Sequence, residues 1–183
     1  EIFNVSANGR NVSFTRNIGN IVMDLDHVEI IELNALGGAD TITVNDLSGT
    51  DMDKIGINLA VGGIGDGLSD MVIVNATESD NTEITVSGSG DFAVVKGLHA
   101  RVEVGGADAG NDSLIINSLG GNDRIDASAF TGVIQLGLAG GNGEDTILGG
   151  ADVLPDFPPR REWIGSPFGL GGGAGGASRE AIG

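Results

Sequence analysis

Short runs in which apolar residues alternate with polar or small ones recur along most of the chain. Alternation with a period of two is typical of a β-strand that has one buried face. In such strands Ile42 and Val44 should point into the core together, and so should Leu114 and Ile116. The runs occupy residues 29–34, 40–45, 54–60, 70–75, 82–88, 100–106, 112–117, 123–128, 133–140 and 145–150.

The segments between these runs are rich in Gly, Asp, Asn and Ser and recur about every ten residues, a spacing that suits an all-β chain. No segment combines a helical period with helix caps, so we expect very little helix. The stretch "NVSFTRN" (11–17) reads as a further strand. We therefore expect residues 1–20 to form an N-terminal strand or cap.

A longer repeat is visible above the strand pattern. "LNALGGAD" (33–40), "VNATESDN" (74–81) and "INSLGGND" (116–123) align, which gives Asn34, Asn75 and Asn117 equivalent positions. We expect these three side chains to form a stacked amide ladder. A strand and turn repeated along a chain favour a solenoid, in which each coil buries its apolar face against the next.

The pattern therefore predicts an all-β protein, a right-handed parallel β-helix or β-roll solenoid over residues 21–154. The spacing of the turns fits a two-sided or a three-sided coil. The alternative fold is an antiparallel sandwich of the cadherin-like kind. Repeated Gly-Asp turns without long loops argue against that alternative.

Composition narrows the class of partner. The 183 residues include 33 Gly, 26 acidic and only 9 basic residues, and the net charge is −17. Such a charge repels nucleic acid and attracts cations. The chain has no Cys, which excludes disulfides and thiolate metal sites. It also lacks an apolar run of about 18 residues, so we expect no membrane span.

The pattern stops before residues 155–183, which hold all four Pro, the only Trp and a Gly-rich run. We expect this tail to be a linker or a capping segment. In the capping interpretation, Trp163 and Phe168 cover the last coil, or mediate self-association or contact with a neighbouring subunit. The chain begins without Met or a signal peptide, so we expect a fragment or a processed product.

Residues 140–148, "GGNGEDTIL", match the nonapeptide G-G-x-G-x-D-x-U-x at every specified position. The chain therefore resembles the RTX (repeats-in-toxin, hemolysin-type) calcium-binding proteins. In that family a six-residue turn binds Ca²⁺ and the next three residues form a short strand. The other Gly-Asp turns, such as "GGADTITV" (37–44), are shorter or longer than the motif, so the repeats are degenerate.

The resemblance implies that Ca²⁺ is bound by the turns, and Ca²⁺ prefers six to eight oxygen ligands from carboxylates and carbonyls. Stacked turns would share each ion, so that it staples adjacent coils, and we expect about one to three sites. The alternative is that the aspartates only close turns by accepting backbone N–H groups. The candidate ligands are Asp145 with Gly140 and Asn142 of its turn, then Asp123 and Asp152, then Asp112, Asp108, Asp70, Asp66 and Asp40.

No catalytic constellation is evident. His27 and His99 are the only histidines, and their sequence contexts are unrelated. Acid pairs such as Asp24 with Asp26 imitate a glycosidase dyad, but such pairs arise by chance in a chain this acidic. We therefore expect that this chain is not an enzyme.

The expected function is that of a calcium-binding structural repeat region in a secreted bacterial protein, located outside the cell or at its surface. Ca²⁺ would neutralise self-repulsion and promote folding outside the cell. Two alternatives remain open. One is a metal-independent adhesin or surface-layer solenoid, and the other is a module of an extracellular carbohydrate-active enzyme.

Overall fold

The computed structural model describes residues 1–80, 83–149 and the backbone of residues 153–155. Over these residues the chain forms sixteen β-strands and one short 3-10 turn, Ile18–Asn20. The prediction of an all-β chain is confirmed. Ten of the strands coincide with the ten alternating runs, and β2 coincides with the strand predicted at residues 11–17.

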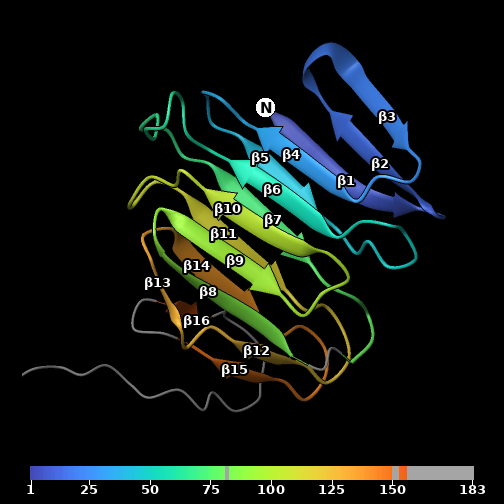
Figure 1. Ribbon diagram of the computed structural model, residues 1–183. Coiled ribbons are helices and arrows are strands. Elements are labelled where there is room, and N and C mark those ends of the chain that lie inside the picture. The colour runs from blue at the N-terminus through green and yellow to red at the C-terminus, as the bar shows by residue number, and fades with distance from the viewer. Residues whose placement is uncertain (81–82, 150–152, 156–183) are drawn as a thin grey trace, which may run out of the picture.

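The strands form two sheets that lie face to face (Figure 1). In sheet A the order is β16 (Val153–Pro155), β14 (Gln135–Ala139), β11 (Ser113–Asn117), β7 (Met71–Asn75), β5 (Thr41–Val44), β1 (Ile2–Asn8), β2 (Asn11–Arg16) and β3 (Ile21–Leu25). In sheet B the order is β15 (Thr146–Leu148), β12 (Arg124–Asp126), β8 (Ile84–Gly90), β9 (Phe92–Lys96), β10 (Arg101–Gly105), β6 (Lys54–Asn58) and β4 (Ile30–Asn34), and β13 (Phe130–Gly132) also pairs with β8.

From β4 onward the chain passes back and forth between the sheets. Strands β4 and β6 lie in sheet B and β5 and β7 in sheet A; after β10 the chain continues through β11, β12, β14, β15 and β16 in the same alternation. Along sheet A, β1, β5, β7, β11, β14 and β16 pair in parallel. The β1–β2–β3 and β8–β9–β10 segments pair antiparallel, so both sheets are mixed.

The core between the sheets is aliphatic. Ile42 is 0% exposed and Val44 is 2% exposed, while Leu114 and Ile116 are both 0% exposed. These side chains point inward as the alternation predicts. Parallel pairing stacks them, because Ile42 lies beside Val72, Val72 beside Leu114, and Leu114 beside Leu136.

Two features differ from the sequence interpretation. Strands β3, β9, β13 and β16 were not predicted. In β3 ("IVMDL") and β9 ("FAVVK") the apolar residues are contiguous and hide the period of two, and β13 and β16 have only three residues each. The proposed equivalence of Asn34 with Asn75 and Asn117 is wrong: Asn34 ends β4 in sheet B, whereas the other two end strands of sheet A. The alignment assumed a constant spacing between repeats. The equivalent strands of sheet A, which follow Asp40, Asp70 and Asp112, are separated by unequal numbers of residues.

The alternation along β11 predicts unequal effects of two neighbouring substitutions. Leu114→Ala removes a side chain from the core and should lower the free energy of unfolding by about 2–5 kcal/mol. Ile115→Ala trims the outward face of the same strand and should cost about 1 kcal/mol or less. Urea denaturation of both variants and the wild type measures the difference. Equal losses would contradict the inward and outward assignment of this strand.

Candidate functional site

The predicted ligands lie in turns that stack because the strands they join are stacked. At one edge of the molecule the chain passes from sheet B to sheet A through residues 35–40, 59–70 and 106–112; we call this the B-to-A edge. At the opposite edge it returns through turns that include residues 118–123 and 140–145; we call this the A-to-B edge. The structure therefore divides the predicted ligands into two groups at opposite edges.

Asp40, Asp70 and Asp112 form a buried row at the B-to-A edge, each directly before a strand of sheet A. They are 1%, 2% and 2% exposed. The Asp40 N–H donates to Asp70 Oδ1 over 2.8 Å, and the Asp70 N–H donates to Asp112 Oδ1 over 2.9 Å. We call this row the aspartate ladder, because each carboxylate holds the backbone of the preceding rung.

The two ends of the aspartate ladder differ in their partners. Asp112 Oδ2 accepts a second bond, from the Asp108 N–H at 2.7 Å. Asp40 Oδ1 lies 2.8 Å from the amino nitrogen of Glu1. Asp40 Oδ2 is buried and accepts no hydrogen bond from any described residue. A buried carboxylate oxygen without a donor is costly, so this end of the ladder has unused capacity to bind a cation or a proton donor.

Asp66 and Asp108 form an outer pair on the same edge. Asp66 Oδ2 accepts from the Gly38 N–H at 2.8 Å, and its Oδ1 accepts from the Leu68 N–H at 2.8 Å. Asp108 Oδ2 accepts from the Gly67 N–H at 2.6 Å. Four of the five aspartates of this edge, all except Asp40, thus accept backbone N–H groups, and the three turns contain no Lys or Arg.

The pKa values of Asp70 in the aspartate ladder and of Asp66 in the outer pair shift in opposite directions. Burial is the main cause that raises the pKa of Asp70 to about 6, and the carboxylates of Asp112, Asp40 and Asp66 raise this pKa as well. The hydrogen bond from the Asp40 N–H only partly opposes the increase. The pKa of Asp66 is instead lowered, because the N–H groups of Gly38 and Leu68 stabilise its ionised form.

At the A-to-B edge the turn 140–145 lies directly on the turn 118–123. Asp145 Oδ1 accepts from the Asp123 N–H at 3.0 Å, and the Asn142 N–H donates to Leu119 O over 2.7 Å. Burial raises the pKa of Asp145 above its ordinary value. This contact between Asp123 and Asp145 repeats the geometry of the aspartate ladder.

Close stacking explains the glycines of the complete motif. Gly141 and Gly143 have positive φ angles of 77° and 133°. A Cβ at Gly141 would lie 1.9 Å from Leu119 O, and one at Gly143 would lie 1.7 Å from Gly121 O. Gly140 is similarly confined, since a Cβ there would lie 2.6 Å from Asp145 Oδ2. The turn needs glycine for its backbone conformation and for its approach to the turn below.

The described residues contain no group of three or more His, Asp or Glu side chains arranged to hold a metal ion. The nearest arrangement is the aspartate ladder, in which the carboxylates follow one another in a line. Asp152 lies outside the described residues, and so do Trp163 and Phe168 of the tail. Their predicted roles remain predictions.

A second ladder was only partly anticipated. Asn117 Nδ2 donates to Asn75 Oδ1 over 2.8 Å, Asn75 Nδ2 to Asn45 Oδ1 over 3.0 Å, and Asn45 Nδ2 to Asn4 Oδ1 over 2.9 Å. Asn34 instead accepts from Asn58 in sheet B at 3.1 Å. The sequence does carry the correct signal: "DTITVN", "DMVIVN" and "DSLIIN" share an Asp before the strand and an Asn after its fourth residue.

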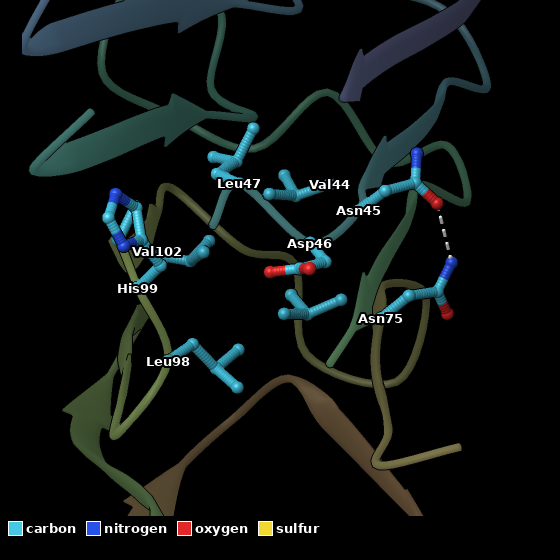
Figure 2. Close-up of a pocket in the computed structure, with 10 residues that line it drawn as sticks. Val44, Asn45, Asp46, Leu47, Asn75, Leu98, His99 and Val102 are labelled. Atoms are coloured by element: carbon cyan, nitrogen blue, oxygen red, sulfur yellow. Dashed lines mark hydrogen bonds between the residues drawn. The ribbon is translucent and has the colours of Figure 1, made fainter. Parts of the chain in front are cut away.

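A small pocket lies where Asn45, Asp46 and Leu47 follow β5, opposite Leu98 and His99 (Figure 2). It has room for about one water molecule, which is too small for a substrate. His99 Nε2 lies 2.9 Å from the carbonyl oxygen of Thr50, so this ring nitrogen serves as a donor. His27 lies elsewhere, exposed, with Nδ1 2.8 Å from Asp26 Oδ1.

No protein-family model, curated protein or solved structure matches this chain. Its function must therefore be inferred from its own residues. No helix in the described part of the chain is long and apolar enough to cross a membrane.

The raised pKa of Asp70 predicts how Asp70→Asn changes stability with pH. The folded protein keeps a proton on Asp70 up to about pH 6, whereas the unfolded chain releases it near pH 4. The wild-type carboxylate therefore destabilises the fold increasingly as the pH rises from about 4 to about 6. Asp70→Asn removes the charge and keeps an acceptor for the Asp40 N–H. It should stabilise the protein at pH 7 by on the order of 1–2 kcal/mol after allowance for solvent screening.

Asp66→Asn is the matched control, because the pKa of Asp66 is lowered. Its ionised carboxylate stabilises the fold above its unfolded pKa, so this variant should be less stable than the wild type at pH 7. The difference should disappear as the pH falls through the lowered pKa. Urea denaturation in EGTA between about pH 3 and pH 8 tests both variants. If Asp70→Asn is instead less stable than the wild type at pH 7, the ionised carboxylate of Asp70 stabilises the fold, which would contradict the prediction.

Proposed function

We propose that this chain is a calcium-binding structural repeat region of the RTX type, with degenerate repeats, in which Ca²⁺ links successive turns. We further propose a two-sided parallel β-roll as the repeating form. The alternation of the chain between two sheets from β4 to β16 supports this form, as does the in-register parallel pairing of β5, β7, β11 and β14.

The observation that carries the proposal is the burial of Asp40, Asp70 and Asp112 side by side without a basic residue in their turns. Three neighbouring carboxylates of 2% exposure or less repel each other through a medium that screens charge poorly. Backbone N–H groups, which carry no net charge, satisfy part of the hydrogen-bonding capacity of Asp70 and Asp112, and the amino group of Glu1 lies beside Asp40 alone. A cation would remove the remaining repulsion.

The donor chemistry fits calcium. The B-to-A edge offers carboxylate and carbonyl oxygens, which a hard cation prefers, and no competing nitrogen ligand from a His. The buried Asp40 Oδ2 accepts no hydrogen bond from a described residue, so it can bind a cation without breaking an existing hydrogen bond. When bound, Ca²⁺ would supply positive charge and cross-links between turns. Asp40, Asp66, Asp70, Asp108 and Asp112 are the proposed ligands at this edge.

At the A-to-B edge we propose that Asp123 and Asp145 bind Ca²⁺ together with Gly140 and Asn142. The stacking of the complete motif on the preceding turn supports this assignment, because the shell of Ca²⁺ needs oxygens from more than one turn. The raised pKa of Asp145 is consistent with a carboxylate that lacks a compensating charge.

A metal-independent structural repeat is the second candidate, and one observation favours it. Asp66, Asp70, Asp108, Asp112 and Asp145 already accept backbone N–H groups, as turn-closing aspartates do. In this alternative the aspartates maintain the register of the turns and the excess charge keeps the protein soluble. The two candidates differ in a single measurable property, the response to calcium.

We also propose that the chain acts outside the cell, in a secreted or surface-bound bacterial protein. Extracellular calcium modules bind with dissociation constants of about 10⁻⁴–10⁻³ M, far above cytosolic calcium levels. A chain with a net charge of −17 would then be poorly compacted before export and more stable after it.

Calcium should raise the melting temperature measured by circular dichroism. For one site with a dissociation constant of ~10⁻⁴–10⁻³ M, ~5 mM CaCl₂ adds about 1–2 kcal/mol relative to EGTA, and MgCl₂ should add less. If the B-to-A edge binds the ion, Asp70→Asn should reduce the stabilisation that calcium adds relative to EGTA. If the A-to-B edge binds it, Asp145→Asn should reduce this stabilisation. Isothermal titration calorimetry gives the number of sites.

Asp126→Asn is the control for these variants, because Asp126 points outward from β12 and pairs with Arg124 at 2.9 Å. It removes the same charge from the chain but should leave the stabilisation by calcium unchanged. Identical melts in EGTA, CaCl₂ and MgCl₂ would remove calcium from the function and leave the metal-independent repeat.

A further inference from the structure

The outward face of sheet A is free of charge across β1, β5, β7, β11 and β14. The outward positions of these five strands carry Thr, Ser, Asn, Gln, Ile, Met, Gly and Ala, and no Asp, Glu, Lys or Arg. Parallel in-register pairing arranges them in straight rows. We call this surface the neutral face.

The outward face of sheet B is different. Lys54 bridges Glu32 and Glu103 there, with 3.7 Å between Lys54 Nζ and Glu103 Oε2. Arg101 pairs with Glu103 at 2.8 Å, and Arg124 of β12 pairs with Glu83 at 2.9 Å. The outward face of sheet B thus carries charged pairs, whereas the neutral face of sheet A carries no charged residue.

The centre of the neutral face is apolar. Ile73 and Ile115 are direct neighbours in register, and Met71 beside them is 38% exposed. On the next strand Gly137 is in register with Ile115, and a Cβ built at Gly137 would be 3.6 Å from Ile115 Cγ1, so the isoleucine packs beside the glycine. Rows of hydroxyl and amide side chains flank this centre, which gives it a polar rim.

We propose that the neutral face pairs two copies of this chain, sheet against sheet. The charge distribution selects this occupant. Two chains of net charge −17 repel each other, and contact through the turns of either edge would oppose carboxylates to carboxylates. The neutral face brings none together, and a two-fold axis through its centre places the Ile73 and Ile115 pair against its own copy.

The size of the face sets the strength of the pairing. Five strands at ~4.8 Å spacing and four to five residues at ~3.3 Å rise give a surface of roughly 24 by 15 Å. Two such surfaces would bury on the order of 700–1,000 Å² in total, which is at the lower limit for specific association. We therefore expect a weak dimer that forms at high concentration.

The dimer is independent of calcium in this proposal, because no carboxylate takes part in the contact. Analytical ultracentrifugation in EGTA should give a weight-average mass that rises from the monomer toward the dimer between about 10 and 500 µM chain. Raising NaCl from about 0.1 to 0.5 M should strengthen the association, since salt screens the repulsion between the two acidic chains.

Thr43→Lys is the decisive variant and Thr85→Lys is its control. Thr43 is half-buried on the neutral face, and Thr85 is half-buried on the outward face of sheet B. Both substitutions lower the net negative charge equally, which by itself favours association. Thr43→Lys should nevertheless weaken the dimer at least tenfold, because it places an ammonium group in the contact. Thr85→Lys should not weaken it, and thermal melts verify that both variants fold.

Three results would overturn the proposal. The first is a monomer at every concentration and salt condition in EGTA. The second is equal weakening by Thr43→Lys and Thr85→Lys, which would place the contact elsewhere. The third is association that requires Ca²⁺, which would indicate bridging of carboxylates at the edges. The first two results leave open whether the turns bind calcium, and the third would overturn the contact through the neutral face while supporting calcium binding at the edges, so the two proposals can fail independently.

Discussion

In-register parallel pairing is the constraint on which the rest of this structure depends. It sets each side chain beside its equivalent on the next strand about 4.8 Å away, so residues of one kind are stacked on their own kind. The constraint favours the aliphatic stack that contains Ile42 and Val72, because apolar surfaces bury each other. It also favours the amides of Asn45, Asn75 and Asn117, since each amide is both donor and acceptor. For aspartates the same geometry stacks like charges.

The aspartate ladder shows two effects that oppose each other. A hydrogen bond from a backbone N–H to a carboxylate contributes about 1.5–3 kcal/mol, and it holds each turn in register with the next. Burial and mutual repulsion act against the ionised form, and the pKa of Asp70, about 6, shows that they outweigh the single N–H bond there. A structural repeat built with Asn at these positions would avoid this cost. The proposed cation-binding role would offset this cost, because a bound cation would neutralise the carboxylates of Asp40, Asp70 and Asp112.

Much of the local structure could be predicted from the sequence, whereas the stacking partners could not. The period of two located ten strands and the inward positions of Leu114 and Ile116, because it depends only on neighbouring residues. The partner of each turn depends on how many residues the chain spends between strands, and the β8–β9–β10 meander makes that number irregular. Asn34 was consequently assigned to the wrong ladder. The correct member, Asn45, could have been found from the pattern that begins at Asp40, in which an Asp precedes the strand and an Asn follows its fourth residue. The motif at residues 140–148 located a turn correctly. The sequence also named Asp40, Asp70 and Asp112 as candidates, but only the fold shows that they form one buried row.

The distribution of charge follows from the same geometry. Any charged residue on the outward face of a parallel in-register sheet meets its equivalents on both sides, so a repeat must alternate signs or omit charge. In sheet B the signs alternate along the strands instead: Lys54 is in register with Arg101, and these cations pair with the glutamates two positions further along, Glu32 and Glu103. Sheet A omits charge and confines the acids to the turns. The proposed cation binding at the edges and the proposed contact through the neutral face would therefore use different residues, and a change in one need not disturb the other. This separation would let the edges respond to the ionic environment while the face retains the same surface for association.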